Sequence, residues 1–235
     1  IVKKIKKLPF PVAVILGNHD HGHDGCGDLL KTQLNVLGDL DFSWKFKEWI
    51  NPSFSLLGAR PCSPGGGFYI SKEVSSVFGP ISLQKSVDLM VNASSDISQK
   101  LPFIILAHSG PVGLGSEAFS PCGRDWRLPA IDWGDKDLSI AIDVIRKIKS
   151  PDLVVFGHTH HILKRGCGRR ITFVQDLWGT SYLNAACVPR EGNDSSGEAL
   201  RHFSWVEFNE NKLSHASHRW YREDFSLAFQ ENLFN

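Results

Sequence analysis

Seven of the ten histidines in this 235-residue chain fall in three short stretches. The stretches are GNHDHGH at positions 17–23, AHSG at 107–110 and GHTHH at 157–161, and each follows an apolar run directly. Imidazole nitrogens combined with amide or carboxylate oxygens are ligands that suit zinc, iron, manganese and similar divalent ions. Three clusters of this composition, placed in the same way, predict a divalent-metal site.

The elements that must position these side chains are the apolar runs VAVIL, FIIL and LVVF. They alternate with segments of helical periodicity, which is typical of a βαβ sheet covered on both faces. We expect strands near 11–16, 54–58, 103–107 and 152–156. Residues just past the carboxyl ends of parallel strands converge on one crevice. We therefore expect Asn18, His108, His158 and His160 to point toward one place.

The rest of the chain predicts further elements around this sheet. Apolar residues at helical spacing indicate helices at 137–148 and 82–97, and the first eight residues have the spacing of an amphipathic helix that lacks an N-cap. Gly- and Pro-rich segments at 62–80 and 110–134 predict long loops, which are often functional. After residue 165, short β-type runs predict an antiparallel meander. The length fits a single domain over 1–235.

Composition excludes several classes of function. The net charge of +1 implies no bulk attraction to nucleic acid or to an anionic membrane, and the apolar runs are too short to span a bilayer. Five scattered cysteines without a C-x-x-C pair argue against a disulfide framework and against a cysteine zinc knuckle. These features favour a soluble protein of a reducing, intracellular compartment, with an organelle left open.

The histidine clusters carry a resemblance to a known family. GNHD at 17–20, the single histidine of AHSG and GHTH at 157–160 occur in the order of the last three signature blocks of the calcineurin-like metallophosphoesterase superfamily. The similarity covers roughly residues 9–190. It implies an α/β/β/α sandwich and two divalent metal ions (Mn, Fe or Zn). It also implies hydrolysis of a phosphomonoester or phosphodiester by metal-bound hydroxide.

The resemblance also implies roles for individual residues. Asn18, His108 and His158 would ligate one metal, and His160 would ligate the second. His19 would be the general acid that protonates the leaving alkoxide, with Asp20 orienting it. Two cations can clamp the negative oxygens of a phosphate ester and activate water, and an imidazole with a pKa of about 6.5 is suited to donate a proton.

The chain departs from the family pattern at its start. Such enzymes begin with Asp-x-His and Gly-Asp-x-x-Asp blocks, which supply the bridging carboxylate, whereas residues 1–17 contain no Asp, Glu or His. We expect these blocks, and the first strands of the fold, to lie upstream of Ile1 in the complete protein. The alternative is that Asp20, His21, His23 and Asp24 replace them.

Without a bridging carboxylate, Coulomb repulsion opposes a pair of cations, so we expect these 235 residues to bind at most one metal tightly at this site and to hydrolyse little. The alternative function is therefore a catalytically incompetent fragment or pseudoenzyme that serves as a binding or interaction module.

Several residues are candidates for contact with a phosphate-ester substrate. His21 and His23 would lie in a loop on the substrate side, or in a solvated turn. Arg60 could place its guanidinium on a phosphate, or form a surface ion pair. Gly65–Gly67 could present backbone amides to an anion, or form a plain loop. The basic stretch KRGCGRR at 164–170 could form a hairpin tip that steers anionic substrates, or a solvated turn.

Overall fold

The computed structural model describes residues 2–165 and 168–235. Helices and strands are interspersed up to residue 156, and the described elements after that residue are all strands. The helices are α1 (Val2–Ile5), α2 (Asp28–Leu37), the 3₁₀ turn η1 (Gly38–Leu40), α3 (Lys72–Phe78), α4 (Leu83–Ala93) and α5 (Lys136–Ile145). The strands are β1 (Phe46–Ile50), β2 (Ser53–Gly58), β3 (Phe103–Leu106), β4 (Leu153–Phe156), β5 (Phe173–Gln175), β6 (Ser181–Asn184), β7 (Glu191–Asn193), β8 (Ala199–Asn209), β9 (Lys212–Arg222) and β10 (Leu227–Phe234).

The first sheet has the strand order β1-β2-β3-β4-β6-β5. Its four inner strands β2, β3, β4 and β6 run parallel, and β1 and β5 pair antiparallel at the edges. The strands expected at 54–58, 103–107 and 152–156 are β2, β3 and β4. Because the inner strands are parallel, the residues that follow β3 and β4 emerge at the same edge of the sheet.

The stretch at 11–16 corrects the expectation of a strand. It is extended, but its only bridge is the parallel one between Val14 and Asp41. The Val14 N–H donates to the Leu40 carbonyl and the Phe42 N–H donates to the Val14 carbonyl. The segment therefore pairs with the loop after η1, where the partner is too irregular to continue a ladder.

Two helices lie where no helix was predicted. α3 falls inside the segment 62–80, and the Ser71 side chain caps it by accepting a hydrogen bond from the Val74 N–H. α2 follows the loop that contains His21 and His23. The carboxylate of Asp24 accepts the backbone N–H groups of Gly27 and Leu29 at the start of α2. At the start of both helices, a short polar side chain satisfies backbone N–H groups that have no partner within the helix.

The second sheet is antiparallel, in the order β10-β9-β8-β7. The expected meander after residue 165 is therefore correct only in part, because β5 and β6 complete the first sheet. β6 pairs parallel with β4, and all four of its residues are buried. A strand buried on both faces lacks the period-2 alternation that marks an antiparallel strand with one solvated face, and β8 shows that alternation clearly.

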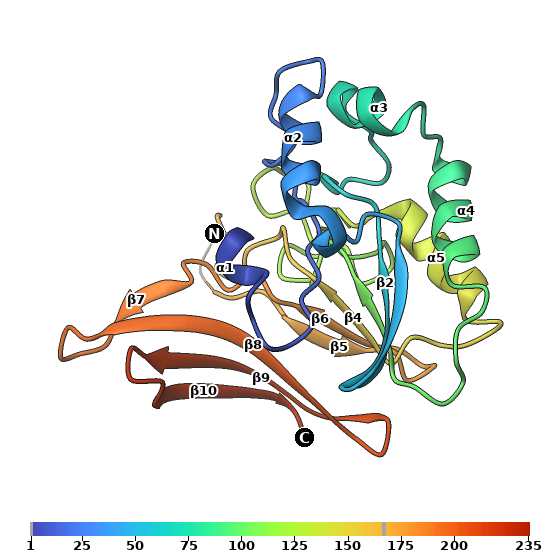
Figure 1. Ribbon diagram of the computed structural model, residues 1–235. Coiled ribbons are helices and arrows are strands. Elements are labelled where there is room, and N and C mark those ends of the chain that lie inside the picture. The colour runs from blue at the N-terminus through green and yellow to red at the C-terminus, as the bar shows by residue number, and fades with distance from the viewer. Residues whose placement is uncertain (1, 166–167) are drawn as a thin grey trace.

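The two sheets lie against each other (Figure 1). Figure 1 shows α4 and α5 over one face of the first sheet and the second sheet near its other face. α5 buries the apolar stripe that was predicted from spacing, and the rings of Phe173 on β5 and Phe234 on β10 are 5.5 Å apart. This is the two-sheet α/β sandwich that the sequence predicts. In the described part of the chain, no helix has both the length and the apolar character needed to cross a membrane.

Candidate active site

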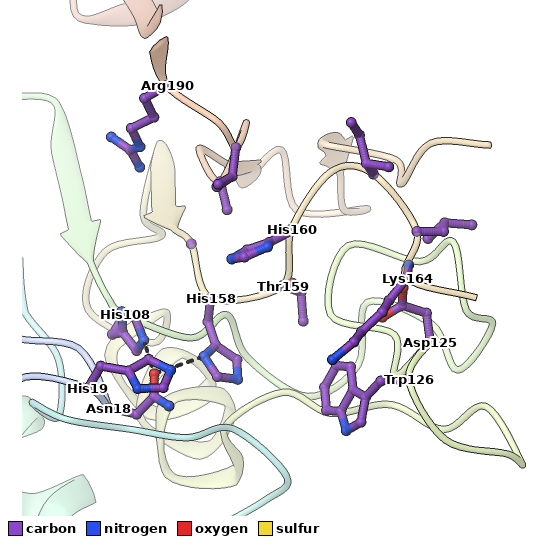
Figure 2. A pocket seen from close by; sticks show the side chains of 15 residues that line it. Asn18, His19, His108, Asp125, Trp126, His158, Thr159, His160, Lys164 and Arg190 are labelled. Carbon is purple, nitrogen blue, oxygen red and sulfur yellow. Dashed lines mark hydrogen bonds between the residues drawn. The ribbon is translucent and has the colours of Figure 1, made fainter. Parts of the chain in front are cut away.

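Three of the predicted ligands meet at the carboxyl edge of the first sheet. The side-chain oxygen Oδ1 of Asn18 lies 2.9 Å from His108 Nε2 and 3.2 Å from His158 Nδ1. His108 follows β3 and His158 follows β4, while Asn18 arrives from the extended segment beside Asp41. Figure 2 shows the three side chains directed at one another. Two parallel strands and one extended segment thus bring together residues that lie up to 140 positions apart.

The backbone around this trio is shaped to hold it. The His108 ring packs against the α-carbon of Gly17, where an added Cβ would lie 2.5 Å from His108 Cε1. The carboxylate of Asp20 accepts the Gly17 N–H at 2.7 Å, so Asp20 closes the turn that carries Asn18. His158 adopts a left-handed φ of 66°, a costly conformation for a residue with a side chain. Such strained residues concentrate at functional sites.

The trio fits a divalent cation. Ligands at right angles around an ion, each at about 2.1 Å, lie about 3.0 Å from one another, which is close to the two separations measured from Asn18 Oδ1. Burial lowers the pKa of His108 to about 3 and the pKa of His158 to about 4. Both rings are therefore neutral at pH 7, which is the state in which imidazole binds a metal.

The trio forms part of the wall of an open cavity of about 780 Å³. His19 and His160 also line this cavity, and both side chains are exposed. In Figure 2, the His160 side chain stands apart from the trio, between it and Arg190. The structure therefore joins three of the four predicted ligands and places the fourth in the same cavity.

Two cationic side chains in this cavity were not singled out from the sequence as site residues. Lys164 was considered only as part of a basic hairpin, and Arg190 was not considered. Arg190 follows β6, the parallel strand next to β4, so it emerges at the same edge of the sheet as His158. If β6 had been recognised in the sequence as a parallel strand, Arg190 would have been a candidate for this edge of the sheet. The carboxylate of Asp125 also lines the cavity, but it pairs with the buried Arg170, so the balance of charge along the cavity wall favours an anionic occupant.

The comparison with protein families agrees with this geometry. The family model for the calcineurin-like phosphoesterases matches residues 1–161, a range that contains all three histidine clusters. The chain belongs to this family. Membership confirms the resemblance and the fold class, and at the family level it implies metal-dependent hydrolysis of phosphate esters. No curated protein matches the chain.

A second cavity of about 400 Å³ adjoins the first in this calcineurin-like phosphoesterase. It shares Asn18 and His19 with the larger cavity, and His21 and His23 line it as well. His21 is buried, and its Nδ1 lies 3.4 Å from a carboxylate oxygen of Glu73 on α3. Asp24 directs both carboxylate oxygens at backbone N–H groups. The carboxylate of Asp24 therefore stabilises the turn before α2, and the loop places His21 and His23 beside the site.

Arg60 corrects an expectation about substrate contact. Only 1% of its surface is exposed, and its guanidinium donates to the carboxylates of Asp135 and Asp137 and to the Tyr69 carbonyl. With its donors engaged inside the calcineurin-like core, Arg60 has no surface to offer a phosphate. The sequence could not show this, because both carboxylates lie more than 70 positions away.

The other two anion-binding candidates are also engaged within the protein. The Gly66 and Gly67 N–H groups donate to the carbonyls of Trp133 and Gly134, so they are not free to cradle an anion. Arg170 is buried, and one of its terminal nitrogens donates to three backbone carbonyls. The expected hairpin tip includes Gly166 and Cys167, which lie outside the described residues. Lys164 is the member of KRGCGRR that lines the cavity.

Proposed function

We propose that this calcineurin-like domain, residues 1–235, hydrolyses a phosphomonoester or phosphodiester in the 780 Å³ cavity. The observation that carries the proposal is that His108 Nε2 and His158 Nδ1 lie 2.9 Å and 3.2 Å from Asn18 Oδ1. These three residues would hold one divalent cation, and His160 would contribute to a second. Divalent cations at such a site activate water and neutralise phosphoryl oxygens.

The remaining side chains of the cavity have distinct roles in this proposal. Lys164 and Arg190 bind the negative charge of the ester. His19 faces the cavity next to Asn18 and delivers a proton to the departing oxygen. Asp20 acts through the backbone, because its carboxylate holds the Gly17 N–H and so fixes the turn that carries Asn18 and His19. His21 and His23 form the wall toward the second cavity and contact the alcohol portion of the substrate.

The test combines metal binding with hydrolysis. Mn²⁺ binding is measured by calorimetry, and turnover of nitrophenyl phosphate and bis-nitrophenyl phosphate is followed with Mn²⁺ present. His108→Ala should weaken Mn²⁺ binding by at least the 10- to 100-fold typical of changes around a metal site, and it should abolish turnover. The matched control is His215→Ala, a histidine on β9 that does not line the cavity.

The possible outcomes separate the two function classes. Hydrolysis that depends on His108 and survives His215→Ala supports the enzyme. Mn²⁺ binding that depends on His108 without any turnover of either ester would overturn hydrolysis by these 235 residues. It would agree with the low activity expected when no bridging carboxylate is present, and it would favour the non-catalytic binding module. Equal effects of the two substitutions on Mn²⁺ binding would overturn the assignment of the metal site itself.

A further inference from the structure

A buried group of ligand-type side chains lies away from the active-site cavity. It consists of Cys187, His202 and His218, whose potential ligand atoms all lie within 4.8 Å of one another. All three residues are buried, with 5% or less of their surface exposed. Cys187 follows β6 of the first sheet, while His202 and His218 come from β8 and β9 of the second sheet. The cluster therefore joins the two sheets.

The His202 ring makes no hydrogen bond to the other described residues. Both of its ring nitrogens are buried and have no hydrogen-bond partner among the described residues. A neutral imidazole has one donor and one acceptor, and leaving both unpaired in the interior costs free energy that folded proteins generally avoid. A bound cation on one ring nitrogen would remove part of that cost.

His218 is held in place beside it. The His218 Nδ1 lies 3.1 Å from the Ser204 hydroxyl, and its Nε2 lies 3.0 Å from the hydroxyl of Thr172, in the segment before β5. The rings of His202 and His218 are 5.2 Å apart. Both ring nitrogens thus have a hydroxyl partner, so an ion on His218 would replace one of these two hydrogen bonds, while the other hydroxyl accepts the N–H of the second nitrogen.

His161 lies near this cluster but is not a ligand. Its Nδ1 accepts the backbone N–H of Val188 at 3.1 Å, so the neutral ring carries its proton on Nε2. The donor set is therefore one sulfur and two imidazole nitrogens.

We propose that Cys187, His202 and His218 bind a zinc ion that ties the two sheets together. A donor set of one sulfur and two imidazole nitrogens favours Zn²⁺ over harder cations such as Mn²⁺ or Mg²⁺. On binding, the Cys187 S–H bond breaks, the sulfur ligates as a thiolate and the proton leaves to solvent. The two histidines bind as neutral rings.

The zinc site also bears on the active-site cavity, because the segment after β6 that carries Cys187 contributes to the cavity wall. Ala186 and Val188, the neighbours of Cys187, both line the 780 Å³ cavity, whereas Cys187 lies with the histidines of the second sheet. The zinc ion would anchor this part of the cavity wall to β8 and β9, which carry His202 and His218. The proposal is independent of hydrolysis, because it concerns different residues and a different metal preference.

Cobalt substitution tests the site with a signal that only a sulfur ligand gives. Co²⁺ added to the metal-free protein should produce thiolate-to-cobalt charge-transfer absorption, and Zn²⁺ should displace it. The predicted ligands of the active-site cavity offer only nitrogen and oxygen donors, so Co²⁺ bound there gives no such band. Cys187→Ser should remove the band. Cys62→Ser is the matched control, a second buried cysteine outside the cluster, and should retain it.

Two further measurements keep the proposal falsifiable if a variant does not fold. His202→Asn should weaken Zn²⁺ binding at least about tenfold. X-ray absorption of the wild-type zinc protein should show one sulfur and at least two nitrogen ligands. A zinc shell of nitrogen and oxygen alone, Co²⁺ uptake without the band, or a band that persists in Cys187→Ser would overturn the proposal.

Discussion

At the scale of single residues, the site depends on close packing between its own members. Gly17 opens the GNHD cluster because the His108 ring occupies the space where a side chain would be. Gly157 opens the GHTH cluster in an ordinary environment, where an added Cβ would only touch Ala186 and the His108 carbonyl at 3.8 Å. The two glycines occupy equivalent places in their motifs and differ in what surrounds them.

Substitution at these glycines provides a matched pair. Gly17→Ala should displace the His108 ring and weaken Mn²⁺ binding about 10- to 100-fold, since a ligand held 1 Å out of place loses most of its effect. Gly157→Ala should bind Mn²⁺ nearly as the wild type does. Calorimetric titration measures both. Equal affinities for the two variants would show that the Gly17 contact does not position His108.

His19 makes a prediction about leaving groups. A proton donor matters most when the departing alkoxide is a poor leaving group, so His19→Ala should reduce turnover of alkyl phosphates by about 10²- to 10⁴-fold. Nitrophenyl phosphates, which leave without protonation, should be affected far less. Steady-state rates on both substrates, in a catalytically active form of the protein, measure the difference. Equal losses, or loss of bound metal, would refute the role of His19 as a proton donor.

At the scale of elements, a buried ionic network fixes the start of α5 against the first sheet. Arg60 follows β2, Asp135 occupies the N-cap position of α5 and Asp137 lies in its first turn. Ser63 and Ser86 add hydroxyl hydrogen bonds to the two carboxylates. Such networks specify how elements pack, because removing one charge leaves the opposite charges buried without a partner.

Arg60→Ala should therefore lower the free energy of unfolding by about 3 to 5 kcal/mol. Arg201→Ala is the control, since its partner Glu191 is 3.8 Å away and largely exposed. Exposed pairs of this kind contribute about 0 to 1 kcal/mol. Urea denaturation measures both variants. A loss for Arg60→Ala no larger than that for Arg201→Ala would mean that the network adds nothing to stability.

At the scale of the whole molecule, buried neutral histidines make stability depend on pH. Burial lowers the pKa of His108 to about 3, and it lowers the pKa values of His158, His202 and His218 to about 4. In the unfolded chain these rings titrate near their usual value of about 6.5. Between about pH 4 and about pH 6.5, these histidines are protonated in the unfolded chain and remain neutral in the folded protein. Stability therefore falls as pH decreases through this interval.

For the metal-free protein, the urea midpoint should decrease steadily from about pH 6.5 to about pH 4, and more slowly above this range. Metal at either site should flatten the curve, because ligated imidazole resists protonation. Denaturation with a chelator, compared with denaturation in the presence of Zn²⁺ and Mn²⁺, tests both statements. A midpoint that is constant from about pH 7 to about pH 5 without metal would contradict the assignment of neutral buried rings.

The sequence by itself was sufficient to identify the three histidine clusters and the strands β3 and β4, which present the second and third of them. Those features are local, because a short apolar run followed by a ligand indicates both the strand and the edge of the sheet at which the ligand emerges. The approach of His108 to His158 follows from that rule, whereas Asn18 reaches them from the extended segment that pairs with Asp41. Their neighbourhood at 107–110 and 157–161 could therefore be predicted without any knowledge of the loops between them.

Only the tertiary structure decided the state of the isolated polar side chains. Nothing near Arg60 in the sequence distinguishes a buried ion pair from a substrate contact, because its partners Asp135 and Asp137 are distant. Arg190 and Cys187 depended in the same way on β6 joining the first sheet. Whether a polar group is buried or exposed is fixed by the segments that pack over it, and those segments are brought together by the fold rather than by neighbouring residues.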